Sequence, residues 1–474
     1  MFCNRNILTQ RLQIVNSGVR RIQNLKFWKA LLILVVLAGI LTLSPAISSL
    51  MNNVVINSFG QISTTTVWAK SGYWRDIQDA VNRAAQADIK NVRIPEGTYN
   101  FVNVGESWTG ARVIIPAGVN LFGAPTERTS ELSYDGIGQN PNDQVVEWKT
   151  VLQIPWEAGI SRPNYVTMFR FVGNGDPSKP SRFSDIKVVG YREFYPQSDR
   201  WYATVEMYNI INFRVDHCFF KNMGGIAVSV RAPANGNCSG VIDHCKFIND
   251  YGYVEWDYAQ CTVHYCIMIR SVGTTRWEDN ITKVVGQYTP YTTFIEDCYF
   301  SRWRHCVSSN DGTHYVFRHN TIEKDSIVGS LDAHGTYDYV GTRAIEIYDN
   351  IIIDPVLNKH PGNWNSTTPS NGEDGYTVNW RGGGGVFFNN YVRDYRIGVE
   401  MTDEGEVLKC YPHNIWIWNN TWVNVEYPMH VSYQGHYYIT ENVDYFLRTP
   451  NQEKDGFEYT PYPYPHPLTQ KEFS

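Results

Sequence analysis

The chain has 474 residues, of which 43% are hydrophobic, 14% aromatic and 19% charged. This composition excludes a disordered chain, a coiled coil and a collagen-like fibre, which need very different mixtures. Six basic residues and no acidic residue fall within residues 1–50, so the remaining chain carries 35 basic and 47 acidic residues and a net charge of −12. Because an acidic body repels phosphate backbones, we expect no nucleic-acid partner.

The first 50 residues have the pattern of an export signal. A run that is apolar except for Thr42, Ala30–Leu43, follows a basic leader and approaches the roughly 20 apolar residues that a membrane-spanning helix needs. Positive charge before such a run keeps the leader on the cytoplasmic side. We therefore predict a cytoplasmic leader over 1–29, a membrane anchor or signal segment over 30–50, and a body outside the cell. The long leader favours an uncleaved single-pass anchor over a cleaved signal peptide, which would give a secreted protein.

One helix is expected next, and then many short strands. Apolar residues at helical spacing predict an amphipathic helix over 73–90, with Ile77, Ala80, Val81, Ala84 and Ala85 on one face. The rest of the chain repeats a pattern of one apolar residue, two further residues and an anchor. Its rows end at Cys218, Cys245, Cys266, Cys298, Asn320, Asn350, Asn390, Asn420 and Asn442.

This repeat predicts a parallel β-helix. The apolar residues three and five positions before the anchors follow strand alternation and should point inward. Asparagine tolerates the left-handed backbone of a sharp bend, and stacked Asn side chains hydrogen-bond along a ladder. Each coil would then be a series of short strands stacked about 4.8 Å from the next coil. The stacked cysteines could be either disulfides or packed free thiols, and we favour thiols.

Three segments near the start of the repeat region share recognisable motifs: Ile77–Val81 (IQDAV), Val92–Tyr99 (VRIPEGTY) and Val113–Gly123 (VIIPAGVNLFG). Together they resemble the entry of the pectate-lyase-like superfamily. The resemblance covers about residues 67–447 and implies a right-handed, single-stranded parallel β-helix, all-β apart from an N-terminal capping helix. Lyases, hydrolases, epimerases, tailspikes and adhesins share that fold, so the resemblance leaves the chemistry open. Residues 448–474 are rich in Pro and Tyr, and we expect an extended tail there.

Ligand clefts in this superfamily usually lie over the first strand of each coil. We place these strands at Val228–Arg231, Val254–Asp257, Val285–Gln287, Val307–Asn310, Leu331–His334, Val378–Arg381, Val399–Thr402 and Val431–Gln434. Alternation then gives two outward columns of mostly polar residues. The first is Ser229, Glu255, Gln287, Ser308, Asp332, Asn379, Glu400 and Ser432, and the second is Arg231, Asp257, Asn310, His334, Arg381, Thr402 and Gln434. We predict a cleft for a polar substrate.

The strongest catalytic candidates are Asp332, His334 and Arg381. Abstraction of the proton beside a uronate carboxylate needs a base and a cation that neutralises the carboxylate, roles that suit His334 and Arg381. Asp332 would orient them, and Tyr337 or Tyr339 would protonate the leaving oxygen. The Asp-x-His spacing resembles the Asp-Pro-His of alginate epimerases, with Ala333 in place of the proline.

We therefore predict β-elimination or epimerisation of a uronate-containing polysaccharide. Substrate contacts are expected from Arg231, Glu255, Asp257, Asn310, Tyr337, Asn379 and Glu400. Since the acidic body opposes a polyanion, Ca²⁺ held by Asp257, Asp332 and Glu400 is a possible cofactor.

Three alternatives remain open. Asp332 and Glu400 lie two coils apart, roughly 9–10 Å, which is near the upper limit for an inverting glycoside hydrolase. A non-catalytic β-helix is the second alternative. Its polar strand face, with Asp332, His334 and Arg381, would then be purely structural, or the protein would bind carbohydrate through the outward aromatic residues Tyr348, Phe388, Trp416 and Trp418. The pairs Asp216-His217 and Asp243-His244 have zinc-ligand chemistry, but polar residues that cap a bend explain them better.

Overall fold

The computed structural model describes residues 54–56, 62–106, 110–129, 144–145, 147–154, 167–190, 203–223, 225–234, 236–249, 265–271, 277, 280–303, 305–323, 329–335, 340–353, 375–404, 411–471 and 473. The predicted leader and the predicted anchor of 30–50 lie outside these residues. Within the described part of the chain, no helix is long and apolar enough to cross a membrane.

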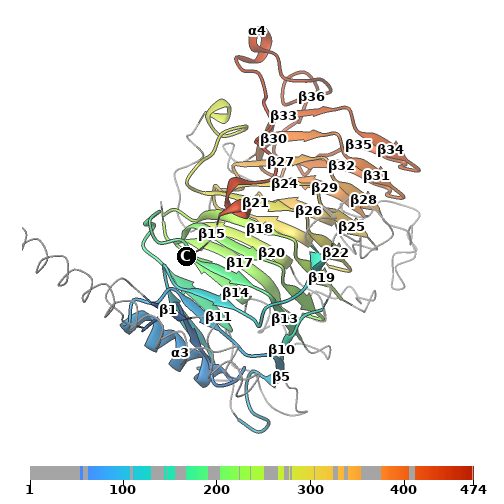
Figure 1. The fold of residues 1–474 in the computed structure, drawn as a ribbon. Coiled ribbons are helices and arrows are strands. Elements are labelled where there is room, and N and C mark those ends of the chain that lie inside the picture. Colours follow the sequence, from blue (N-terminus) through green and yellow to red (C-terminus); the bar gives the residue numbers. More distant parts are fainter. Residues whose placement is uncertain are drawn as a thin grey trace, which may run out of the picture. The chain divides into compact units, whose positions relative to one another are not determined.

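The chain divides into two compact units at Thr65 and Thr66. In the first unit, β1 (Val54–Ile56) pairs with β2 (Ile62–Thr64) in an antiparallel ribbon. The second unit holds three parallel sheets, whose strands follow one another in chain order (Figure 1). Because each sheet takes about one strand in three along the chain, the second unit is a parallel β-helix, as the repeat predicted.

The strands of the three sheets have the following bounds. The first sheet contains β6 (Val113–Pro116), β11 (Phe169–Val172), β14 (Ala203–Tyr208), β17 (Ile226–Ala232), β20 (Tyr265–Ser271), β23 (His305–Ser309), β26 (Gly329–Ala333), β29 (Tyr376–Trp380), β32 (Ile397–Thr402) and β35 (Tyr427–Ser432). The second contains β3 (Thr66–Trp68), β4 (Asn91–Arg93), β7 (Asn120–Phe122), β12 (Arg182–Ser184), β15 (Ile211–Asp216), β18 (Ser239–Asp243), β21 (Thr292–Glu296), β24 (His314–Arg318), β27 (Ala344–Tyr348), β30 (Gly383–Phe388), β33 (Pro412–Trp418) and β36 (Tyr445–Phe446). The third contains β5 (Gly97–Asn100), β10 (Thr150–Gln153), β13 (Ile186–Val189), β16 (Phe219–Lys221), β19 (Lys246–Ile248), β22 (Tyr299–Ser301), β25 (Thr321–Glu323), β28 (Ile351–Ile353), β31 (Tyr391–Arg393) and β34 (Thr421–Val423).

Five short elements of the second unit lie outside these sheets. The antiparallel pair β8 (Arg128–Thr129) and β9 (Gln144–Val145) forms one ribbon. The others are the 3₁₀ helices η4 (Ile281–Lys283) and η6 (Pro467–Gln470) and the short helix α4 (Gln452–Asp455).

The helix α3 (Trp74–Gln86) caps the first coil. Its buried face contains Ile77, Ala80, Val81 and Ala84, as predicted, whereas Ala85 is exposed. The helix also covers an exposed sheet edge: Gln78 accepts a hydrogen bond from the amide of Ile114 (2.7 Å) and donates one to its carbonyl (3.1 Å). The helix thus pairs backbone groups of Ile114 that an open edge would offer to another strand.

Asparagine side chains form the predicted ladder at the bend after the second sheet. The side-chain oxygens of Asn320, Asn350, Asn390 and Asn420 each accept a hydrogen bond from the backbone amide of the anchor one coil earlier, at 2.9–3.2 Å. The left-handed residue is not the anchor but its predecessor, for example Asp349 (φ 56°) before Asn350. The bend turns at that residue, which leaves the anchor side chain free to point along the stack.

The six described cysteines are buried free thiols. Cys218, Cys245 and Cys298 occupy successive anchors of the bend, so the expected packing as small apolar side chains is confirmed. Burial raises the pKa of the Cys218 thiol well above its ordinary value, which makes it a poor nucleophile.

Two rows of the predicted repeat are wrong. Val263–Cys266 was expected at the bend, but Tyr265 and Cys266 begin β20 of the first sheet. The last coil enters the second sheet at Tyr445–Phe446 and not at Ile439–Asn442. Both rows match the apolar-to-anchor pattern by composition, and the pattern carries no information about which sheet a strand joins.

Candidate active site

The first sheet presents two outward columns of side chains in register. The first column is Arg170, Glu206, Ser229, Met268, Ser308, Asp332, Asn379, Glu400 and His430. The second is Tyr208, Arg231, Arg270, Asn310, His334, Arg381, Thr402 and Ser432. Asp332, Asn379 and Glu400 therefore stand in successive coils, and His334 and Arg381 are neighbours in the second column, as the sequence predicted.

Two coils of the predicted columns are wrong, and one observed coil takes their place. The strand between β17 and β23 is β20. Met268 therefore occupies the place predicted for Glu255 and Gln287, and Arg270 occupies the place predicted for Asp257. Glu255 and Asp257 lie outside the described residues, and Val285–Gln287 follows η4 in a turn. Each of these segments starts with valine and alternates, so sequence alone could not choose among them. The two positions predicted to be acidic thus hold the thioether of Met268 and the guanidinium of Arg270.

The last coil is shifted by two residues from its predicted register. Glu400 lies beside His430, and Thr402 lies beside Ser432, whereas the sequence placed Ser432 and Gln434 in those positions. A shift of two keeps every side chain on its expected face, so the alternation cannot reveal it. His430 was missed for this reason.

Asp332, Arg381, Glu404 and His334 form one cluster. Arg381 donates two hydrogen bonds to the carboxylate of Asp332, from Nε at 3.0 Å and from a terminal nitrogen at 2.7 Å, and a third to Glu404 at 2.8 Å. Ser308 donates to Asp332 at 3.1 Å. Burial alone would raise the pKa of Asp332, but the guanidinium of Arg381 holds it well below its usual value. Asp332 is therefore a charged positioning group.

His334 is the half-exposed member of this cluster. Its Nδ1 hydrogen-bonds the carbonyl of Gly335 and lies 3.5 Å from Glu404 Oε2. Because a carbonyl only accepts, Nδ1 carries the hydrogen and Nε2 keeps its lone pair. Burial and the positive charge of Arg381 lower the pKa of His334, so the ring is neutral and able to accept a proton. Tyr337, the predicted proton donor, lies outside the described residues, as does Tyr339.

Half-exposed arginines line the same face before His334. Arg170 contacts Glu206 at 2.7 Å, Arg231 contacts the other oxygen of Glu206 at 4.0 Å, and Arg270 contacts Asp311 at 3.1 Å. The acids are almost fully buried, whereas 31–43% of each arginine side chain is exposed. The exposed charge of this face is therefore positive. Arg270, Asp311 and Glu404 were not predicted as site residues.

Glu400 has its own set of partners at the end of the first column. It is fully buried, and it accepts hydrogen bonds from His430 Nδ1 at 2.6 Å and from Ser432. Burial raises the pKa of Glu400, although Ser432 and His430 oppose the shift. Asn379, between Asp332 and Glu400, accepts a hydrogen bond from Thr402 at 3.3 Å. Asn310, in the second column, accepts a hydrogen bond from the backbone amide of Asp311 at 2.8 Å.

These contacts do not fit the predicted calcium site. Both oxygens of Asp332 face the guanidinium of Arg381, and those of Glu400 face His430 and Ser432. Calcium needs six to eight oxygen ligands that are not already paired with cations. Asp257, the third expected ligand, lies outside the described residues.

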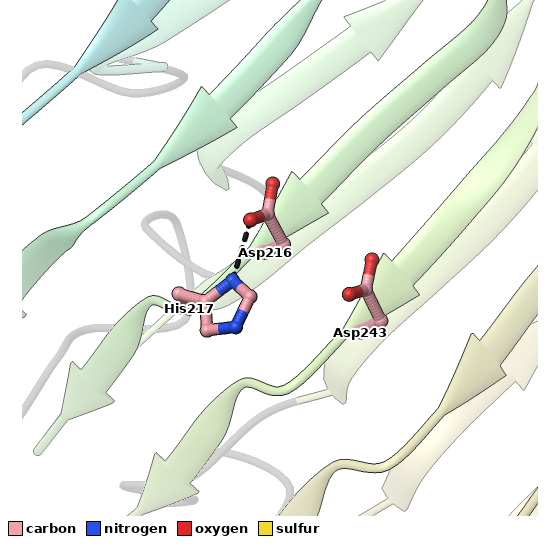
Figure 2. A group of neighbouring side chains, drawn as sticks. All are labelled: Asp216, His217 and Asp243. Carbon is pink, nitrogen blue, oxygen red and sulfur yellow. Dashed lines mark hydrogen bonds and ion pairs between the residues drawn. The ribbon is translucent and has the colours of Figure 1, made fainter. Parts of the chain in front are cut away.

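A second candidate metal cluster lies at the bend of the second sheet. Asp216, His217 and Asp243 have ligand atoms within 4.8 Å of one another, and His217 Nδ1 bonds Asp216 at 2.6 Å (Figure 2). However, Arg182 donates two hydrogen bonds to Asp216, and Arg214 donates two to Asp243. The carboxylates are thus neutralised by buried guanidinium groups, and the cluster forms part of a charge ladder between coils.

The outward aromatic residues of the second sheet are covered. Tyr348, Phe388 and Trp418 stack in successive coils, with centroids 4.8 and 4.3 Å apart. Tyr459 of the C-terminal tail packs edge-on against Phe388 at 5.4 Å, and Phe457 packs against Trp416 at 4.9 Å. The flat surface that would favour sugar stacking is therefore occupied by the chain's own tail.

The comparisons with known proteins return similar folds only. No protein-family model and no curated protein sequence matches the chain. A mutant tailspike protein of E. coli bacteriophage HK620 in complex with a pentasaccharide is similar at 13% identity and a TM-score of 0.47, over 79% of this chain and 62% of the tailspike chain. The chain thus spans less than two thirds of that tailspike.

Two further structures are similar over comparable lengths. The A-module of Azotobacter vinelandii mannuronan C-5 epimerase AlgE4 has 12% identity and a TM-score of 0.29, over 77% of this chain and 97% of the module. The catalytic domain of Agl-KA has 14% identity and a TM-score of 0.36, over 78% of this chain and 68% of the domain. Likeness at this level concerns the fold, and the chemistry rests on the side chains of this chain.

Proposed function

We propose that this protein is an enzyme that acts on a uronate-containing polysaccharide along the first sheet. The proposed reaction begins with removal of the proton next to the uronate carboxylate and ends in β-elimination or epimerisation. The observation that carries the proposal is a neutral, half-exposed imidazole, His334, beside a row of half-exposed arginines.

His334 supplies the base in this proposal. Its Nε2 lone pair takes the proton, while Glu404 faces Nδ1 and stabilises the imidazolium that forms. Arg381 and Asp332 position Glu404 against the imidazole, because Arg381 binds both Asp332 and Glu404. In the elimination the carbon–oxygen bond to the next sugar breaks as the double bond forms. In the epimerisation the carbanion receives a proton on its opposite face.

The arginines support an acidic substrate. Arg231 and Arg270 are neighbours in the second column, and Arg270 comes two coils before His334. A carboxylate on a bound sugar would meet these guanidinium groups, which bind carboxylates in a two-pronged geometry. Arg381, by contrast, already binds two internal carboxylates.

Hydrolysis is the second candidate. The environments of Asp332 and Glu400 shift their pKa values in opposite directions: Arg381 keeps Asp332 ionised, and burial favours the protonated form of Glu400. A carboxylate and a carboxylic acid are the groups that an inverting glycoside hydrolase uses, and their separation here, roughly 9–10 Å by stacking, is near the upper limit for that mechanism.

Incubation with a panel of uronate polymers separates these functions. Elimination yields an unsaturated product that absorbs in the ultraviolet, and hydrolysis yields new reducing ends without that absorbance. Epimerisation changes neither chain length nor absorbance, so it is detected as a change in the uronate composition of the polymer. Parallel reactions with Ca²⁺ and with a chelator test for a metal requirement. Binding of these polymers with no product in any arm would favour a non-catalytic carbohydrate-binding protein.

We also propose that the enzyme works outside the cell, anchored by residues 30–50. The basic leader and the apolar run support this orientation. An epitope placed after residue 474 should be labelled on intact cells and should remain in the membrane fraction. Recovery from the cytosol alone would overturn the proposal.

A further inference from the structure

The carboxylate partner of Arg270, Asp311, has no role in the reaction as described so far. Arg270 on β20 contacts Asp311 with its Nε 3.1 Å from the carboxylate. About 35% of the Arg270 side chain is exposed, compared with 2% of the Asp311 side chain. Asp311 directly follows Asn310, which stands one coil, about 4.8 Å, before His334 in the second column.

Backbone hydrogen bonds tie the turn of Asp311 to the segment around His334. The amide of Gly312 donates to the carbonyl of Gly341 at 2.7 Å, and the amide of Thr342 donates to the carbonyl of His334 at 2.9 Å. Asp311 itself has a left-handed backbone (φ 58°), which aspartate tolerates. The turn that holds Asp311 therefore lies next to the segment that holds His334, and the buried carboxyl of Asp311 lies against the more exposed Arg270.

We propose that Asp311 is a further catalytic residue, which donates a proton to the leaving oxygen, and that Arg270 binds the substrate carboxylate. This inference rests on the elimination proposed above. It replaces Tyr337 and Arg381 in those two roles with residues whose positions are described and whose polar groups face each other.

The step balances as follows. The C–H bond next to the carboxylate breaks, and its proton goes to Nε2 of His334. The electron pair forms the carbon–carbon double bond, and the carbon–oxygen bond to the next sugar breaks. The leaving oxygen takes the proton of Asp311 and becomes a hydroxyl, and Asp311 is left as a carboxylate beside Arg270. Transfer of the proton from His334 to Asp311 through water restores both groups.

The charges around Asp311 suit this role. Arg270 contacts the Asp311 carboxyl directly, and His334 and Arg231 also act on it electrostatically. Burial raises the pKa of Asp311, although Arg270 opposes the shift. A substrate carboxylate bound to Arg270 would add a negative charge next to Asp311 and partly offset the positive charge of Arg270. The pKa of Asp311 would rise further, which favours its protonated form. The substrate would thus help to protonate its own acid catalyst.

The test compares two leaving groups in the wild type and in the Asp311→Asn variant. One substrate is the uronate polymer, whose leaving oxygen needs a proton, and the other is a uronate with fluoride in that position, which leaves as an anion. General acid catalysis is worth about 10²–10⁴-fold. We expect Asp311→Asn to lose at least about 100-fold on the polymer and to keep its rate on the fluoride.

Asp349→Asn is the matched control. Asp349 is also an aspartate with a left-handed backbone (φ 56°) and a pKa raised by burial, but it lies at the bend of the second sheet. It should behave as wild type on both substrates. The wild-type rate on the polymer should also fall at high pH as Asp311 ionises, and this limb should be absent in Asp311→Asn.

The outcomes separate the inference from the function. If the wild type turns over both substrates and Asp311→Asn loses both equally, or neither, Asp311 is not the proton donor while the elimination stands. If the wild type turns over neither substrate, the proposed elimination fails, and this role of Asp311 fails with it.

Discussion

His334 is the residue on which the proposed chemistry depends. Its side chain is about 31% exposed and packs in no core cluster, so His334→Ala should leave the fold intact. We expect this variant to lose at least about 100-fold in kcat/KM on the responsive uronate polymer, because the base is gone. His436→Ala, at an exposed histidine of the last coil, is the control and should retain activity.

The pH dependence of the wild type should also report His334. The base must be neutral, and burial and Arg381 lower its pKa, so activity should persist below the pH at which an ordinary histidine protonates. The rate should then fall as the pH falls through the lowered pKa. A kcat/KM profile with its acidic limb at or above the ordinary histidine range, about 6.5, would argue against this base.

Asp332 should contribute more to stability than to proton transfer. Its carboxylate is fully buried against Arg381, and removal of one partner of a buried pair costs about 3–5 kcal/mol. We expect Asp332→Asn to lower the free energy of unfolding by this amount at neutral pH, measured by urea denaturation.

The sign of the pH effect follows from the lowered pKa of Asp332. The stabilisation is fully present above the unfolded pKa of about 3.9 and is lost as the pH falls through the lower folded pKa. The difference between wild type and Asp332→Asn should therefore shrink in acid. A difference that stays constant down to pH 2 would contradict the assigned ion pair.

The alternation of residues along a strand predicts some of the site residues. It does not predict residues whose position depends on which segment of the chain forms each coil. Asp332, His334 and Arg381 follow from a period of two and a repeat of one coil. Arg270 was missed because a false bend at Cys266 put Glu255 and Asp257 in its coil. Asp311 and Glu404 follow their strands, where the backbone turns and alternation no longer predicts direction.

At the scale of elements, the asparagine ladder joins successive coils. The side-chain oxygen of Asn350 accepts a hydrogen bond from the backbone amide of Asn320 at 2.9 Å, and its side-chain nitrogen donates one to the side-chain oxygen of Asn390 at 2.9 Å. Asn350→Ala would leave a buried amide without its partner, so we expect a loss of about 1–3 kcal/mol in the free energy of unfolding.

The control for this prediction is Asn82→Ala, at an exposed position of α3 where alanine suits the helix. It should leave the free energy of unfolding within about 0.5 kcal/mol of wild type. Equal effects of the two variants in urea denaturation would show that the ladder does not stabilise the coils.

The stack of strands was predictable, whereas the lengths and paths of its connections were not. Buried apolar residues such as Phe213 and Val215 repeat in every coil because each coil must fill the same interior. The coil between Cys245 and Cys298 contains two long connections, and one of them carries η4. The spacing of the repeat, with its additional anchor at Cys266, predicted two coils where the structure has one.

At the scale of the whole β-helix, the C-terminal tail lies along the second sheet. Tyr459 and Tyr462 donate hydrogen bonds to Glu346 at 2.6 and 2.9 Å, and Arg214 reaches the carbonyl of Thr469 at 2.9 Å. Near the first coils, the carbonyl of Phe473 accepts a hydrogen bond from Asn120 at 3.3 Å. One segment thus connects late coils to early ones.

Removal of residues 456–474 should expose the aromatic row of the second sheet. Phe388 and Trp416 would lose Tyr459 and Phe457, so we expect a lower urea midpoint and increased binding of a hydrophobic dye. Tyr438→Ala, at a side chain that is already 71% exposed, serves as the control. An unchanged midpoint in the truncated protein would show that the tail does not stabilise the sheet.

The fate of the hydrogen next to the uronate carboxylate tests the central claim most directly. The responsive polymer is incubated with the enzyme in D₂O and followed by proton NMR. We predict that this hydrogen is removed or replaced by deuterium, and that His334→Ala abolishes the change. Cleavage of the polymer with the hydrogen retained would contradict proton abstraction by His334 and would favour hydrolysis by Asp332 and Glu400.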